Sequence, residues 1–132
     1  MQVRWASPSL GEEEEREVLD SLRAGWVTMG PKVRAFEDGI AKYLGVKHAV
    51  ALNSGTAALD VALKAMGVGP GDEVIVPDLT YIATANSVMY QHATPVLVDV
   101  DPTYLNIDPE KVRSSITKKT KAIVPIDYGD PI

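Results

Sequence analysis

The sequence contains no cysteine and only two histidines. The lack of cysteine excludes disulfide bonds and thiolate-bound metal centres, and it favours a cytoplasmic protein. His48 and His92 stand apart from other ligand-type residues, so the sequence predicts no metal site. Basic residues are few: 13 Lys and Arg against 18 Asp and Glu give a net charge of -5. This balance argues against nucleic acid as a partner, because binding to phosphate backbones needs a basic surface.

Long apolar runs are also lacking. No stretch approaches the length of a membrane span, and the N-terminus lacks the basic-then-apolar pattern of a signal peptide. The composition, 45% hydrophobic and 23% charged, is ordinary for a globular domain with its own core. We therefore expect a soluble, cytoplasmic domain with no membrane partner.

The first third of the chain has the pattern of two helices. Helical periodicity predicts one helix over residues 9–24 and a second over residues 31–44, where Pro31 suits the first helical position. The loop between them carries Trp26, which on its own is typical of a side chain that closes the edge of a core. We assign residues 1–46 to an N-terminal helical segment.

From residue 47 onward, short apolar runs alternate with helical patterns. Strands are expected at residues 47–52, 73–76, 95–100 and 122–126, separated by helices at about 55–67, 80–91 and 108–116. Continuous apolar strands separated by helices indicate a sheet covered on both faces. The prediction is an α/β fold with three layers, in which a parallel or mixed sheet lies between helices.

The residues between the first predicted strand and its helix are small and mostly polar. A strand-to-helix turn leaves backbone N–H groups free at the positive end of the helix dipole, where a phosphate can bind. Gly55 lets an anion approach the backbone, and the hydroxyls of Ser54 and Thr56 can add hydrogen bonds. A plain helix N-cap is the alternative, because Ser and Thr are common in that role.

Three loops fall at the carboxyl edge of the predicted sheet, where ligands bind in folds of this type. They are residues 53–56, 77–81 and 127–129, and Asp99 and Asp101 can share the same edge. A phosphate-binding turn on the same edge as Tyr81 points to a flat, phosphorylated ligand.

Several blocks of sequence carry a further signal. They are residues 25–31 (Gly-Trp-Val-Thr-Met-Gly-Pro), 53–59, 69–77, 80–86 and 95–101, followed by Tyr128-Gly129. Together and in this order, the blocks resemble the opening third of a DegT/StrS-type sugar aminotransferase. The resemblance implies pyridoxal 5′-phosphate (PLP) chemistry: the cofactor forms a Schiff base with a lysine, takes an amino group from an amino acid, expected to be glutamate, and passes it to a keto-sugar nucleotide.

The resemblance also implies roles for individual residues. The cofactor-binding residues would be Ser54, Gly55, Thr56 and Ala57 around the phosphate and Tyr81 against the pyridine ring, and the substrate-binding residues would be Trp26 and Thr28. Residues 47–132 would then be the first part of the cofactor-binding domain, and the enzyme would be a homodimer or a larger assembly.

Two departures from the family pattern shape the expected activity. Asp127 stands where the family often has histidine, and we interpret it as a structural carboxylate. The family's Schiff-base lysine and its pyridinium-pairing aspartate lie beyond residue 132, and no lysine here replaces the first. We therefore expect no catalytic residue in this chain and no turnover by the chain alone. A regulatory protein that binds a phosphate or a partner, and a Rossmann-like nucleotide enzyme, remain as alternatives.

Overall fold

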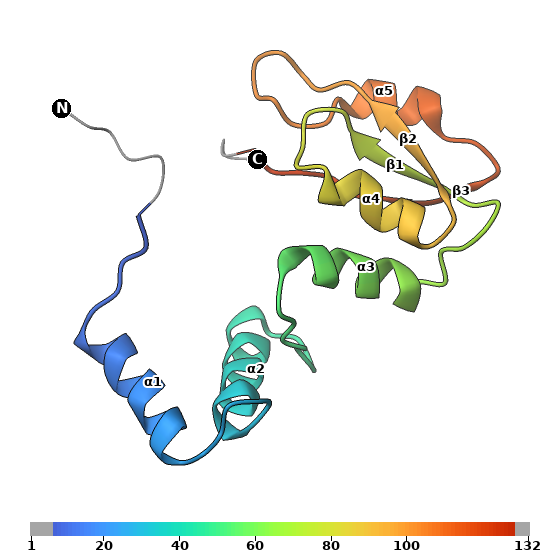
Figure 1. Cartoon of the computed structure of the whole chain (residues 1–132). Coiled ribbons are helices and arrows are strands. Elements are labelled where there is room, and N and C mark those ends of the chain that lie inside the picture. Colours follow the sequence, from blue (N-terminus) through green and yellow to red (C-terminus); the bar gives the residue numbers. More distant parts are fainter. Residues whose placement is uncertain (1–6, 129–132) are drawn as a thin grey trace. The chain divides into compact units, whose positions relative to one another are not determined.

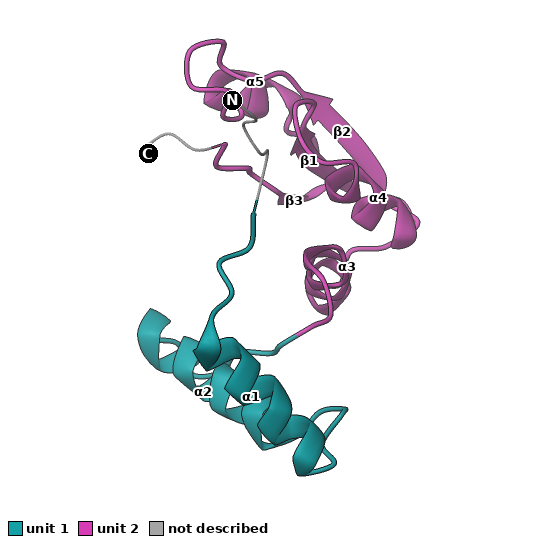
Figure 2. Cartoon of the chain, turned by 60° about the vertical axis from the view of Figure 1, so that its left-hand side comes forward, with its two compact units in different colours: residues 1–51 teal, residues 52–132 magenta. Residues whose placement is uncertain are grey.

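The computed structural model describes residues 7–128, which fall into two compact units divided between Ala51 and Leu52 (Figure 2). The boundary expected from the sequence lies slightly earlier, at residue 46. The assignment of the second part to a cofactor-binding domain stays a prediction.

The first unit contains two helices, α1 (Glu12–Arg23) and α2 (Pro31–Leu44). Helix α1 begins after Gly11, whose backbone N–H donates to the Glu14 carboxylate at 2.7 Å. This hydrogen bond lowers the pKa of Glu14. In α2, the proline occupies the first turn, and Gly45 ends the helix with a positive φ of 67°. Both predicted helices are confirmed, although α1 begins three residues later than expected.

The predicted strand over residues 47–52 is wrong. These residues form no regular element, and Val50 is 75% exposed instead of buried. An apolar run becomes a strand only where another strand can complete its hydrogen bonds, and the described part of the chain places no strand beside it. The backbone N–H of Ala51 instead donates to Glu37 Oε1 of α2 at 2.9 Å.

The second unit is built on a parallel sheet with strand order β2-β1-β3. Its strands are β1 (Glu73–Pro77), β2 (Thr94–Val98) and β3 (Thr120–Ile123). The central strand β1 is almost entirely buried, as expected for a strand with neighbours on both edges and helices on both faces. The α/β class is confirmed, and the sheet is parallel.

Helices cover both faces of this sheet (Figure 1). They are α3 (Gly55–Ala65), α4 (Ala83–Tyr90) and α5 (Pro109–Ser115). The connection through α4 leads from β1 to one edge of the sheet, and the connection through α5 returns past β1 to the other edge. Because such crossovers are right-handed, α4 and α5 must lie on opposite faces. Helix α3 packs against α4 and belongs to the same layer.

A single apolar cluster joins α3 and α4 to the sheet. Its buried members are Leu63, Val68, Val74, Val76, Val88, Ala93 and Ala122, with Ala85 and Val124 packed against them. The cluster holds α3 and α4 on the same side of the sheet. None of the helices in the described part of the chain has the length and apolar composition needed to cross a membrane.

Candidate functional site

The start of α3 presents unused backbone donors. Ser54 is the N-cap, and its side-chain oxygen accepts a hydrogen bond from the backbone N–H of Ala57 at 3.1 Å. The N–H groups of Gly55 and Thr56 have no acceptor among the residues that the structure describes. Two donors at the positive end of a helix therefore remain available to an anion. The N-cap interpretation of Ser54 is confirmed, and it leaves these two donors unoccupied.

A hollow of about 770 Å³ lies over this helix start and the start of α4. Gly55 and Thr56 line it from α3, and Thr80, Tyr81 and Thr84 line it from the other side. Tyr81 is 77% exposed, so its ring is free to face a ligand. Three of the residues predicted to bind the cofactor therefore meet in one hollow. Ser54 and Ala57 do not line it, and the Ala57 N–H is occupied by Ser54 Oγ.

No binding role was predicted from the sequence for two threonines of this hollow, Thr80 and Thr84. Thr80 Oγ1 and Thr84 Oγ1 lie 2.8 Å apart, and Thr84 is only 2% exposed. A helix was expected to begin near residue 80, but α4 begins at Ala83, so Tyr81 lies in the preceding loop. The contact between the two threonines depends on where α4 begins, which the sequence pattern did not locate.

Trp26 and Thr28 line a separate hollow of about 400 Å³ in the first unit. Trp26 is 53% exposed, so it does not close the edge of a core in this unit. A Cβ at Gly30 would lie 2.8 Å from Trp26 Cε3, so a larger residue there would force the indole to shift. Beside it, Lys32 Nζ lies 2.6 Å from Glu17 Oε2 and lowers the pKa of Glu17. The hollow therefore presents the indole of Trp26 and the side chain of Lys32, whereas Glu17 does not line it.

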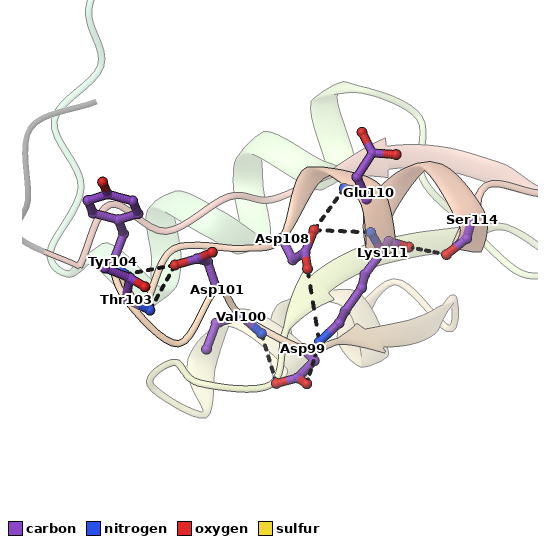
Figure 3. A network of polar contacts seen from close by, with 9 residues as sticks. All are labelled: Asp99, Val100, Asp101, Thr103, Tyr104, Asp108, Glu110, Lys111 and Ser114. Atoms are coloured by element: carbon purple, nitrogen blue, oxygen red, sulfur yellow. Dashed lines mark hydrogen bonds and ion pairs between the residues drawn. The ribbon is translucent and has the colours of Figure 1, made fainter.

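Asp99 and Asp101 follow β2 and are engaged in structural contacts (Figure 3). Asp99 Oδ2 lies 2.6 Å from Lys111 Nζ of α5, and this contact lowers the pKa of Asp99 and raises that of Lys111. Asp101 Oδ1 accepts hydrogen bonds from the backbone N–H groups of Tyr104 and Thr103, which lower its pKa. Asp108 caps α5 in the same network.

Replacing Lys111 with methionine should raise the pKa of Asp99. The lysine is the main cause of the lowered pKa, so Asp99 should titrate closer to its ordinary range, as followed by its carboxyl carbon shift in NMR.

The same substitution should change how stability depends on pH. Because the folded pKa of Asp99 lies below the unfolded one, ionised Asp99 stabilises the fold above the unfolded pKa, and this contribution disappears as pH falls through the folded pKa. Lys111→Met should therefore show a weaker loss of stability on acidification. Arg113→Met removes a charge from the same helix and should leave Asp99 unchanged; equal shifts in both variants would contradict this assignment.

The last part of the sheet edge is only partly described. The backbone N–H of Tyr128 donates to Asn106 Oδ1 at 2.9 Å, and Asp127 is exposed. Gly129, which belongs to the third predicted edge loop, lies outside the described residues. Within residues 7–128, no three His, Asp or Glu side chains gather in a way that could hold a metal ion.

Comparison with known proteins places this arrangement in a family. The sequence model of the DegT/DnrJ/EryC1/StrS aminotransferase family matches residues 8–131. The chain belongs to this family. This chain is 51% identical over 125 residues to the spore coat polysaccharide biosynthesis protein SpsC of Bacillus subtilis (strain 168). The alignment covers 95% of this chain and 32% of that protein.

Two further relatives agree with this assignment. GDP-perosamine synthase of Caulobacter vibrioides is 53% identical over 137 residues, covering 98% of this family member and 37% of the synthase. The PMP-form structure of Spr1654 from Streptococcus pneumoniae superposes with a TM-score of 0.92 at 41% identity, covering 97% of this chain and 32% of Spr1654. The chain thus spans about a third of the length of the curated relatives it matches.

Proposed function

We propose that this chain supplies the phosphate-binding part of a PLP-dependent sugar aminotransferase. One observation carries the proposal: two backbone N–H groups without an acceptor among the described residues, at Gly55 and Thr56, line the same hollow as the exposed ring of Tyr81. A helix start suits a phosphate, and an aromatic face suits a flat pyridine ring. Membership of the aminotransferase family, together with a relative solved in PMP and PLP forms, supports this choice of ligand.

The residues present fit the phosphate end of this cofactor. A Cβ placed on Gly55 meets no atom within 4 Å, so the space in front of the helix start is open to an anion. When bound, PLP supplies an electron sink for amino-group chemistry, while the protein supplies binding and orientation. In this proposal, the backbone N–H groups of Gly55 and Thr56 donate to the phosphate, and the hydrogen bond between Ser54 and Ala57 holds the turn. The Tyr81 ring packs against the pyridine ring of the cofactor and limits its tilt.

The substrates proposed are an amino acid donor, expected to be glutamate, and a keto-sugar nucleotide. Support comes from the names of two relatives, a GDP-perosamine synthase and a spore coat polysaccharide biosynthesis protein. Trp26 and Thr28 are proposed as substrate-binding residues, because an exposed indole offers a stacking surface for a base or a sugar. A homodimeric assembly and a cytoplasmic location stay predictions.

The chain is not expected to complete the reaction by itself. PLP-dependent transfer requires a desolvated lysine aimed at the cofactor aldehyde. No lysine is among the described residues that line the hollow. Lys118 and Lys119 lie in an exposed turn far along the sequence, before β3. We therefore propose a role in holding the cofactor and assign no catalytic residue within residues 7–128.

Comparing two vitamers tests the proposal on the chain as it exists. Pyridoxamine 5′-phosphate lacks the aldehyde and so avoids adducts with surface lysines, and pyridoxamine differs from it only by the phosphate. We expect calorimetry to show binding of the phosphorylated form at least about tenfold tighter, because charge-assisted hydrogen bonds to the phosphate are lost without it. Equal affinity for the two compounds would contradict the proposal.

A separate sample treated with PLP and borohydride tests whether the chain carries the reactive amine. One dominant lysine adduct would overturn the claim that it does not.

A further inference from the structure

Two threonine hydroxyls flank Tyr81 in the sequence, one in the loop before α4 and one in its first turn. Thr80 Oγ1 and Thr84 Oγ1 lie 2.8 Å apart, within hydrogen-bond distance. The backbone N–H of Thr84 also donates to the carbonyl oxygen of Tyr81 at 3.0 Å. Tyr81 is therefore tied to Thr84 twice, once through its own carbonyl and once through the residue that precedes it.

Thr84 is firmly held, whereas the ring of Tyr81 is not. Thr84 is 2% exposed, and its carbonyl oxygen accepts a hydrogen bond from Ser87 Oγ at 2.9 Å. Tyr81 is 77% exposed. An exposed aromatic ring has few neighbours to restrict it, so its direction depends on the backbone that carries it. The conformation of residues 80–84 consequently decides where the ring points.

We propose that Thr84 is a positioning residue for Tyr81. Its hydroxyl fixes Thr80, and together they hold the turn in the conformation that presents the Tyr81 ring to the hollow over α3. The inference rests on the proposed function and deepens it, because it assigns part of the cofactor affinity to a buried residue that acts through Tyr81. Without the hydroxyl, the turn samples other conformations, and the apparent affinity falls with the fraction of molecules that remain competent.

Thr84→Val and Thr84→Ser test this role. Valine keeps the branched shape but removes the hydroxyl, and serine keeps the hydroxyl but removes a methyl group. With ¹³C-labelled tyrosine in the cofactor-free chain, NMR relaxation should show a more mobile Tyr81 ring in Thr84→Val and a ring like that of the parent in Thr84→Ser. Pyridoxamine 5′-phosphate should bind Thr84→Val about 2–10-fold more weakly, the usual cost of one lost hydrogen bond, and Thr84→Ser should restore most of the affinity. Thr94→Val makes the same chemical change at an exposed position of β2 and should alter neither readout.

The two readouts separate this inference from the proposed function. A Tyr81 ring in Thr84→Val that is as ordered as in the parent would overturn the positioning role, whatever the affinity. A more mobile ring in a chain that binds no pyridoxamine 5′-phosphate in any form would support the positioning of Tyr81 and contradict the cofactor proposal. A Thr84→Ser variant that behaves like Thr84→Val would also overturn the role of the hydroxyl.

Discussion

Gly55→Asp is expected to weaken the binding of pyridoxamine 5′-phosphate by about 100-fold or more. A carboxylate at this position would stand beside the proposed phosphate, and two unit charges about 5 Å apart repel each other by about 3 kcal/mol at an effective dielectric constant near 20. The fold should not suffer, because a Cβ at Gly55 meets no atom within 4 Å and an acidic residue in the first turn is favourable for the helix dipole. Calorimetry for affinity and thermal unfolding for stability measure the two effects separately.

Gly55→Asn provides the matched control, because it adds nearly the same volume without the charge. We expect its affinity to lie between those of the parent and Gly55→Asp. If Gly55→Asp binds the phosphorylated vitamer as well as the parent does, the phosphate does not occupy the start of α3. If both substitutions unfold the chain, position 55 has no room for a side chain, which contradicts the open space in front of Gly55.

Leu63→Ala is expected to lower the free energy of unfolding by about 2–5 kcal/mol, as is usual for deleting a buried leucine side chain. Leu63 is 3% exposed and lies in the apolar cluster that joins α3 to the sheet. The lost contacts and the remaining cavity both contribute to the cost. Urea unfolding followed by circular dichroism measures the change.

Val61→Ala is the control for this prediction within the same helix. Val61 is 48% exposed and lies outside the buried cluster, so its truncation should cost well under half as much as that of Leu63. Equal losses in the two variants would mean that α3 is not attached to the sheet through Leu63. The result matters for the site, because the attachment of α3 positions the proposed phosphate-binding turn.

Most of the fold could be predicted from the sequence, and the exception is the run at residues 47–52. The three strands of the sheet and the helices between them follow from apolar periodicity and from turn residues, which are local signals. The run at residues 47–52 has the same local pattern yet forms no strand, because pairing depends on a neighbour that local sequence does not specify. The contact from Ala51 to Glu37 spans 14 residues and has no local signature.

The candidate site divides in the same way. Gly55 and Thr56 could be predicted from the helix start and the family resemblance, although the strand expected before that helix does not form. Tyr81 could be predicted from the loop after β1 and from the same resemblance, and the structure brings the three residues to one hollow. Thr84 could not be singled out, because its burial and its contact with Thr80 depend on where α4 begins. Asp99 lies after β2 at the sheet edge, as expected. Its ion pair with Lys111 of α5 could not be predicted from the sequence, and this contact engages it in the structure.

The most direct test of the central claim is the amide spectrum of ¹⁵N-labelled chain during titration with pyridoxamine 5′-phosphate. If the phosphate binds at the start of α3, the amide signals of Gly55 and Thr56 should shift most, because their N–H groups would gain a charged acceptor. Pyridoxamine without the phosphate should leave these two signals in place. Largest shifts in another part of the chain, or equal shifts with both compounds, would contradict the assignment of this turn as the phosphate site.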